Sequence, residues 1–417
     1  MTLRPALLAL LLAACLAPAR AAVFVIGLDG ADPGVTGALV KAGRLPNLAA
    51  LMKDGVTGRL DTLSPLPLSS PSIWTSVATG AGEAKHGITG FVKPGGAWFR
   101  SGDRRAPALW NMASARGKSV AAAGWLLTYP AEPVNGVMVS NNYFMAIGTH
   151  SAVYPPALSL TTPRAFAFES GAGPALAARL AGVPLPALFP FMPPLGTYDS
   201  PDFREHYLLE KLGDYALADE GWARVGEELL ERGAYDLFLA YLPGTDRVSH
   251  LAWGAYEAGK SGGKVPFAGL VPAYYAYTDA LLGRLLARAG KEDTVIVLSD
   301  HGFKLREGAA PLTVVSGDHR PGGLFVAKGP ELKKGARLAG PLLDRDVAPT
   351  VLYLLGLPAA RTMDGKLAAD IFREGALKAR PQEFTDSYPA AAPQGNGENL
   401  PFTPQELERL RLSGYLQ

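Results

Sequence analysis

Three short apolar runs, each followed closely by an acidic residue, constrain the fold of this chain more than any other feature. They are residues 23–28 (VFVIGL), 236–242 (DLFLAYL) and 294–298 (TVIVL), and a shorter run follows at 324–327 (LFVA). Continuous apolar runs of this length are typical of strands that are buried on both faces. Helical patterns at 45–53 and 273–289 lie between them. The alternation predicts an α/β fold, with a large, mostly parallel central sheet covered by helices on both faces.

Carboxylates follow the three main runs. Asp29 comes directly after the first run, Asp246 shortly after the second, and Asp300 shortly after the third. In open α/β sheets, functional groups gather at the carboxyl ends of the strands. Three carboxylates that converge there repel one another unless positive charge lies among them. A metal ion is the simplest source of that charge.

Three of the six histidines accompany these carboxylates. The candidate metal ligands are Asp29, Asp246, His250, Asp300, His301 and His319. If the chain after Thr245 is helical, Asp246 and His250 share one helix face and can chelate one ion. Mixed Asp and His ligation suits zinc or a similar divalent ion. Any one of these residues alone is more often a turn or surface feature, but the whole set predicts a site for a pair of ions.

A serine lies at the start of a predicted helix in residues 68–80 (LSSPSIWTSVATG). We predict that Ser70 is the N-cap and that Pro71 occupies the first helical position. A hydroxyl there faces free backbone N–H groups and the positive end of the helix, which favours a bound phosphate and a developing alkoxide. A capping role alone also explains a serine at this position. The residues themselves therefore leave open whether Ser70 is a nucleophile or only a cap.

Composition excludes several classes of protein. Hydrophobic residues make up 48% and charged residues 19% of the chain, a balance typical of folded globular proteins. The formal net charge is only +2 and basic residues form no run, which argues against a nucleic-acid polymer as partner. Cys15 is the only cysteine, so the chain forms no intrachain disulfide. No stretch is long and apolar enough for a transmembrane helix.

Residues 1–21 are predicted to be an export signal. Arg4 supplies a positive start, residues 6–14 are apolar but too short to span a bilayer, and residues 19–21 (ARA) have the small-x-small form of a cleavage site. This predicts a periplasmic or secreted protein. A second interpretation stays open, because residues 12–15 (LAAC) resemble a lipoprotein box. In that case Cys15 carries a lipid anchor.

The rest of the chain is divided into a catalytic domain and a C-terminal extension. We expect the catalytic domain at residues 22–376, with a lid inserted at about 91–235, since the Pro-, Ala- and Gly-rich part of that segment lacks clear periodicity. Residues 377–417 are expected to form a connector and a helix. The helix is predicted to begin at the capping box of residues 403–406 (TPQE).

The order of these residues resembles the alkaline-phosphatase superfamily, and within it the branch of type I phosphodiesterases and nucleotide pyrophosphatases. The resemblance extends over residues 22–375. The matching positions are Asp29, Ser70 with Gly80 ending its helix, the pair Asp246 and His250, the run Asp300-His301-Gly302, and His319. The resemblance implies an alkaline-phosphatase-like fold and an enzyme that hydrolyses small phosphate esters.

The resemblance also assigns roles to the candidate residues. It implies that one divalent ion is held by Asp246, His250 and His319. It implies that the second is held by Asp29, Asp300, His301 and the Ser70 oxygen. Zinc is the expected metal. In the implied mechanism, Ser70 attacks phosphorus to form a phosphoserine, which water then hydrolyses.

Alternatives remain at this point. Around residues 125–142, where related enzymes hold the extra oxygens of a monoester, the chain offers only the neutral side chains of Trp125, Thr128, Asn141 and Asn142, which favours a diester or nucleotide-type substrate. A phosphomonoesterase or a phosphomutase on the same core stays open. So does a non-catalytic exported binding protein. A metal-free serine hydrolase is disfavoured, because the chain has no G-x-S-x-G motif.

Overall fold

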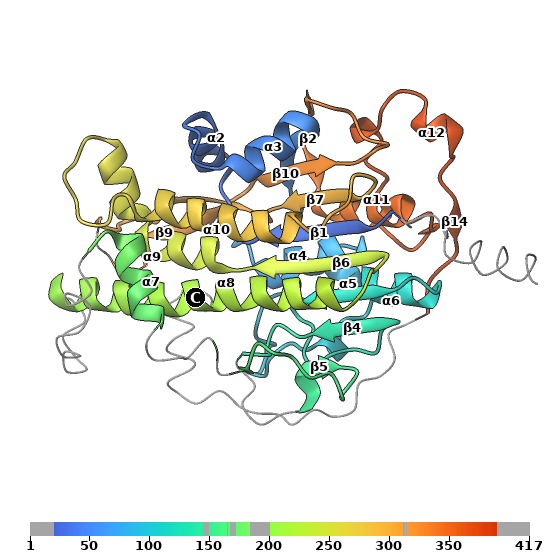
Figure 1. The fold of residues 1–417 in the computed structure, drawn as a ribbon, viewed down its shortest axis with the longest axis horizontal. Coiled ribbons are helices and arrows are strands. Elements are labelled where there is room, and N and C mark those ends of the chain that lie inside the picture. The colour runs from blue at the N-terminus through green and yellow to red at the C-terminus, as the bar shows by residue number, and fades with distance from the viewer. Residues whose placement is uncertain are drawn as a thin grey trace, which may run out of the picture.

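A single large sheet runs through the molecule (Figure 1). In the computed structural model, the fold is described for residues 21–144, 150–164, 166, 172–183, 201–311, 313 and 315–389. The 10-stranded sheet has the order β11-β2-β10-β7-β1-β6-β3-β4-β5, with β12 paired to β2. Its strands are β1 (Val23–Leu28), β2 (Val56–Asp61), β3 (Val120–Ala123), β4 (Gly136–Val139), β5 (Val153–Tyr154), β6 (Leu237–Leu242), β7 (Thr294–Leu298), β10 (Gly323–Lys328), β11 (Ala336–Arg337) and β12 (Leu342–Leu343).

The centre of this sheet is parallel. Strand β1 pairs in parallel with both β6 and β7, and β3 pairs in parallel with β6 and β4. Antiparallel pairing occurs where β10 lies between β7 and β2, and where β5 joins β4. Two small ribbons lie outside the sheet: β8 (Gly302–Leu305) with β9 (Gly317–Arg320), and β13 (Ala359–Ala360) with β14 (Phe384–Thr385). The predicted α/β class with a mostly parallel sheet is confirmed.

Helices cover both faces of the sheet (Figure 1). On one face lie α2 (Pro33–Lys41), α3 (Pro46–Asp54), α7 (Ala172–Ala181), α8 (Pro201–Arg232), α9 (Gly244–Lys260) and α10 (Leu270–Leu286). On the other lie α4 (Ser70–Thr79), α6 (Leu109–Ala115) and α11 (Val347–Leu354). The helices α5 (Glu83–His86) and α12 (Ala376–Ala379) each form one short turn. Within the described residues, no helix combines the length and apolarity needed to cross a membrane.

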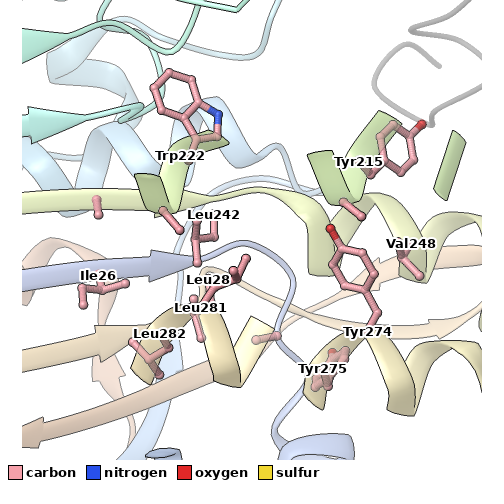
Figure 2. Close-up of a cluster of buried hydrophobic side chains, with 14 of the residues drawn as sticks. Ile26, Leu28, Tyr215, Trp222, Leu242, Val248, Tyr274, Tyr275, Leu281 and Leu282 are labelled. Atoms are coloured by element: carbon pink, nitrogen blue, oxygen red, sulfur yellow. The ribbon is translucent and has the colours of Figure 1, made fainter. Parts of the chain in front are cut away.

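The alternation of side chains along β1 explains why both faces need a cover. Phe24, Ile26 and Leu28 point into one apolar cluster, whereas Val23 and Val25 point into the other. All are nearly or fully buried, which matches a strand that is apolar at every position. Figure 2 shows part of the first cluster, with Ile26 and Leu28 near Leu242 of β6 and near Leu281 and Leu282 of α10. Trp222 of α8 belongs to the same cluster.

Three sequence predictions are corrected. The segment 91–235 is not a lid along its whole length, because β3, β4 and β5 are strands of the central sheet. Ser70 is not the N-cap of its helix: Ser69 takes that position and Ser70 is the first helical residue. The domain does not end at residue 376, since β14 pairs with β13 and the Tyr388 hydroxyl donates to the Pro358 carbonyl at 2.7 Å.

Two further predictions lie outside the described residues. These are the export signal with Cys15, and the C-terminal helix from Thr403. Both stay predictions.

Candidate metal centre at the carboxyl edge of the sheet

The three aspartates meet because the three central strands end at the same level. In the parallel register, Leu28 of β1 lies opposite Leu242 of β6, and Gly27 lies opposite Leu298 of β7. The chain therefore leaves the sheet at one edge three times, and Asp29, Asp246 and Asp300 follow. All three side chains are fully buried.

The first group of ligands consists of Asp246, His250 and His319. Helix α9 begins at Gly244, so the condition stated for the chain after Thr245 is met: Asp246 and His250 lie one turn apart, with Oδ1 and Nε2 separated by 3.4 Å. His319 comes from β9, and its Nε2 lies 2.8 Å from Nε2 of His250 and 3.1 Å from Oδ1 of Asp246. Zinc bonds of about 2.0–2.2 Å separate neighbouring ligand atoms by roughly 3.3 Å. The triangle therefore has the dimensions that one divalent ion requires.

The second group consists of Asp29, Asp300 and His301. His301 Nε2 lies 3.5 Å from Asp29 Oδ1 and 3.3 Å from Asp300 Oδ2. The other oxygen of Asp300, Oδ1, accepts a hydrogen bond from the Gly30 amide at 3.1 Å. Oδ2 of Asp300 is buried and accepts no hydrogen bond from any described residue. An orphaned carboxylate oxygen inside a ligand group is unfavourable unless a cation binds it, so these residues fit a metal ion.

The two groups are contiguous. His301 Nε2 also lies 3.7 Å from Asp246 Oδ1, and the rings of His301 and His319 stack with their centroids 3.7 Å apart. His301 borders both groups. A ring nitrogen of His301 lies within 4.8 Å of ligand atoms of Asp29 and Asp300, and one also lies within that distance of ligand atoms of Asp246 and His319. The structure thus brings all six predicted ligands into one cluster.

Burial makes the charges of this cluster unfavourable in the metal-free protein. Burial, together with the charges of Asp300 and Asp246, raises the pKa of Asp29 well above its usual range. Burial also lowers the pKa of His301 to about 4, so its imidazole is neutral at physiological pH and can act as a ligand. Burial alone would raise the pKa of Asp246, but His250 and His319 hold it well below its usual range. A divalent cation would relieve the repulsion among the carboxylates.

Ser70 lies within the second group. Its Oγ is 3.3 Å from Asp29 Oδ1 and 3.2 Å from His301 Nε2, and the residue is buried. Helix α4 begins at Ser70 with Pro71 next, and proline has no N–H. The Ser72 and Ile73 amides donate to the Ser69 carbonyl at 3.0 and 3.1 Å, so the free first-turn amides that the sequence predicted beside this hydroxyl are already hydrogen-bonded. The predicted nucleophile and the predicted ligands of the second ion are nevertheless neighbours.

A hydrogen bond from an aromatic side chain also holds Asp29, and the sequence did not predict this contact. The hydroxyl of Tyr241 on β6 donates to Asp29 Oδ2. The Tyr241 ring meets Trp74 of α4 edge-on at 5.3 Å, and Trp74 meets Trp125 at 5.2 Å. Gly27 leaves the space for this packing, because a Cβ there would lie 2.7 Å from the Trp74 ring. The one signal in the sequence was Tyr241 itself, a lone hydroxyl in an apolar strand that needs a partner when buried.

Neutral residues near this aromatic group bond to one another. The Thr128 hydroxyl donates to the Trp125 carbonyl at 2.6 Å, and the Thr128 amide donates to the Asn141 side chain at 3.1 Å. Asn141 in turn donates to Asn142 at 2.8 Å. These are the residues that the sequence offers where related enzymes hold a monoester, and the structure shows them as one hydrogen-bonded cluster.

The fold and the cluster together define a class of protein, and comparison with known proteins identifies it. The chain matches the type I phosphodiesterase/nucleotide pyrophosphatase family over residues 23–312. It therefore belongs to this family, which lies in the alkaline-phosphatase superfamily and consists of metal-dependent phosphoric ester hydrolases. Among curated proteins, none matches the chain.

Solved structures agree on the fold. A mutant of the alkaline phosphatase PafA superposes with a TM-score of 0.52 at 11% identity, over 84% of this chain and 99% of that one. Human ectonucleotide pyrophosphatase/phosphodiesterase 5 gives a TM-score of 0.50 at 13% identity, over 85% of this chain and 100% of that one. Phosphonoacetate hydrolase from Sinorhizobium meliloti 1021 gives 0.42 at 18% identity, and the match covers 70% of this chain but only 59% of the hydrolase. The first two of these matches confirm the alkaline-phosphatase-like fold.

Proposed function

We propose that this chain is an exported hydrolase of small phosphate diesters, acting at a two-metal site through a phosphoserine intermediate. One observation carries the proposal: the Ser70 hydroxyl lies within 3.3 Å of Asp29 Oδ1 and 3.2 Å of His301 Nε2, inside a ligand cluster large enough for two ions. A serine that only caps a helix has no need of such neighbours. We assign one ion to Asp246, His250 and His319, and the other to Asp29, Asp300, His301 and Ser70.

The reaction proceeds by two displacements on phosphorus. Bound divalent ions would lower the pKa of the Ser70 hydroxyl and neutralise charge on the phosphoryl oxygens. Ser70 Oγ attacks phosphorus and the leaving oxygen departs with its bonding electrons, which gives a phosphoserine. Water then attacks the same phosphorus, the bond to Ser70 Oγ breaks, and the serine recovers its proton.

Zinc is the proposed metal, because mixed carboxylate and imidazole ligands suit it. A diester is the proposed substrate, because the side chains of Thr128, Asn141 and Asn142 carry no charge and already bond to one another. They provide no cation for the second negative charge of a monoester.

A substrate panel tests this proposal. The metal-free protein is reconstituted with zinc, manganese or magnesium and assayed on an aryl monoester, an aryl diester, a nucleotide and a phospholipid-type diester. We expect zinc and the aryl diester to give the highest kcat/KM. A monoester that is preferred at least tenfold would overturn the diester assignment, and phosphate transferred to an acceptor alcohol rather than to water would indicate a phosphotransferase.

The nucleophile is tested with a matched pair of variants. Ser70→Ala is expected to lower kcat by at least about 10³-fold, as for other essential nucleophiles. Ser69→Ala is the control, because Ser69 is the neighbouring N-cap and its side chain makes no capping hydrogen bond. It should retain activity close to that of the wild-type protein. If Ser70→Ala is as active as Ser69→Ala, Ser70 is not the nucleophile.

Export is tested on the mature protein from fractionated cells. N-terminal sequencing and mass measurement should give a chain that begins at Ala22. A chain that begins at a lipidated Cys15 would support the lipoprotein alternative, and a chain that begins at Met1 would refute export.

A further inference from the structure

An ion pair between buried Asp32 and partly exposed Arg320 lies next to the ligand-bearing segments. Arg320 Nη2 lies 2.6 Å and Arg320 Nε 3.1 Å from Asp32 Oδ2. The aspartate side chain is 3% exposed, whereas the arginine side chain is 41% exposed. An ion pair with one fully desolvated member requires close geometry to be favourable, which the fork of the arginine provides.

The two oxygens of Asp32 have separate partners. Oδ1 accepts from the amides of Gly34 at 2.8 Å and Val35 at 3.1 Å, and so caps helix α2. Oδ2 accepts from the Phe303 amide at 3.0 Å as well as from Arg320. Helix capping requires only Oδ1. Oδ2 is therefore devoted to contacts outside the helix.

Those contacts join three segments that carry ligands. Asp32 ends the short turn that begins at Asp29. Phe303 follows Asp300 and His301, and the Arg320 backbone follows His319. Asp32 lies 271 residues before Phe303 and 288 before Arg320 in the sequence, yet one of its carboxylate oxygens bonds to both.

The contacts leave little freedom of movement. Arg320 Nε also donates to the Phe303 carbonyl at 2.7 Å, beside the antiparallel pairing of β8 with β9. A Cβ on Gly302 would lie 2.6 Å from Asp32 Oδ2, so only glycine allows this approach. On the other side, the Tyr275 hydroxyl accepts from the Asp32 amide at 2.8 Å and donates to the Gly30 carbonyl at 3.1 Å.

We propose that Asp32 and Arg320 are positioning residues of the metal centre, which hold Asp29, His301 and His319 at the separations that metal binding requires. Ligands on separate loops bind an ion weakly unless other contacts order them before the ion arrives. The Asp32–Arg320 pair supplies that order through one shared oxygen. This inference rests on the proposed two-metal site.

The test uses Asp32→Asn, because asparagine is as good an N-cap as aspartate. Its amide oxygen can keep the bonds to Gly34 and Val35, but its NH₂ group then faces the donors of Phe303 and Arg320. Zinc affinity of the metal-free protein is measured by competition with a chelating dye, and stability by urea unfolding. We expect zinc affinity to fall by about 10–100-fold. Arg320→Gln, at a half-exposed side chain, should weaken zinc binding in the same direction.

The control is Asp279→Asn, at another buried aspartate that caps a helix. Asp279 accepts from the Leu48 amide at 2.9 Å and the Asn47 amide at 3.0 Å at the start of α3, and contacts none of the ligands. This variant is expected to lose stability while its zinc affinity stays within about twofold of the wild type.

Three outcomes overturn the inference. Wild-type zinc affinity in both Asp32→Asn and Arg320→Gln shows that the pair does not position the ligands. An equal loss of affinity in Asp279→Asn shows that the effect is global destabilisation. A wild-type protein that binds no zinc at all refutes the proposed metal site itself, and the wild-type titration distinguishes this failure from the other two.

Discussion

Both oxygens of the Asp29 carboxylate receive a hydroxyl group, and the two hydroxyls have different surroundings. Tyr241 donates to Oδ2 from a ring fixed by Trp74, so it can orient Asp29 but cannot approach a substrate. Ser70 reaches Oδ1 at 3.3 Å from the first position of α4. Its hydroxyl also lies 3.2 Å from His301 Nε2, inside the ligand cluster. Of the two, only Ser70 is arranged to react, which agrees with the nucleophile role proposed for it.

His86 is a second buried histidine near α4, and its hydrogen bonds define a structural role. Nδ1 accepts from the Ile88 amide at 3.1 Å, so Nε2 carries the proton and donates to Ser76 Oγ at 3.1 Å. Burial, followed by the charges of Arg104 and Arg105, lowers the pKa of His86 from 6.5 to about 4. The folded protein therefore holds this imidazole neutral.

This gives a prediction for stability against pH. The folded pKa of His86 lies below the unfolded one, so the unfolded chain takes up the proton first as the pH falls from 6.5 towards 4. The contribution of His86 is complete above that range and is lost within it. Between about pH 8 and about pH 5 the loss amounts to roughly 2 kcal/mol of unfolding free energy. Urea unfolding at both pH values should show it, and His86→Gln should reduce the difference by that amount. Equal pH dependence in the two proteins would contradict the assignment.

At the scale of elements, helix α9 carries two of the candidate ligands, and its start is fixed by a residue of α8. Asp219 Oδ1 accepts from the Gly244 amide at 3.1 Å, and Oδ2 accepts from the Tyr274 hydroxyl at 3.0 Å. A Cβ at Gly244 would lie 2.0 Å from that hydroxyl, so the chain needs glycine where α9 begins. Burial raises the pKa of Asp219 from 3.8 to about 7.

Replacement of this carboxylate by an amide is expected to stabilise the protein at alkaline pH. The folded pKa of Asp219 lies above the unfolded one, so its stability contribution is complete below pH 3.8 and is lost as the pH rises through 7. Asp219→Asn can accept from Gly244 and donate to Tyr274 without a buried charge. Its gain in unfolding free energy should be roughly 2 kcal/mol larger at about pH 8 than at about pH 5. A gain that does not change with pH, measured by urea unfolding, would show that Asp219 does not titrate in this range.

The elements that the sequence revealed are those with strong local patterns. The strands at 23–28 and 294–298 have the predicted bounds, and α9 follows β6 as expected, because continuous apolar runs and helix starts are local signals. Strands β3 (VAAA) and β4 (GVMV) were missed, since β3 is mostly alanine and β4 is only four residues long, too short for a clear β pattern. They form strands because β3 pairs with β6, and β4 with β3, in the folded sheet. The lid prediction failed for that reason.

The same distinction holds within the site. The six candidate ligands could be proposed from the sequence because strand ends in a parallel sheet converge wherever the strands are, and the structure does bring the six side chains together. The sequence did not predict the roles of Tyr241, Asp32 and Arg320, because those roles depend on which loops meet after folding. Asp32 looks like an ordinary helix cap in the sequence, and only the register of β8 with β9 brings Phe303 and Arg320 to its second oxygen.

At the scale of the whole molecule, the ligand cluster joins distant parts of the chain. Its members come from the end of β1, the start of α9, the turn after β7 and strand β9, which spans residues 29 to 319. The cluster therefore lies where the N-terminal, middle and C-terminal parts of the sheet meet. Three buried carboxylates at that junction oppose folding through their mutual repulsion. Bound cations would neutralise these carboxylate charges and so link the three parts of the chain through their ligands.

Metal removal is therefore expected to destabilise the entire domain rather than one loop. An ion that binds only the folded state stabilises it by about 2.7 kcal/mol when its concentration is 100 times Kd. Treatment with EDTA should lower the Tm by several degrees, and added zinc should restore it in a concentration-dependent manner. Asp246→Asn is the informative variant, because it removes one buried charge and one ligand together. Without metal its Tm should lie below that of the wild type, because His250 and His319 stabilise the charged Asp246 in the folded protein. Zinc should also raise its Tm less than that of the wild type. An identical zinc response in the two proteins would mean that Asp246 holds no ion.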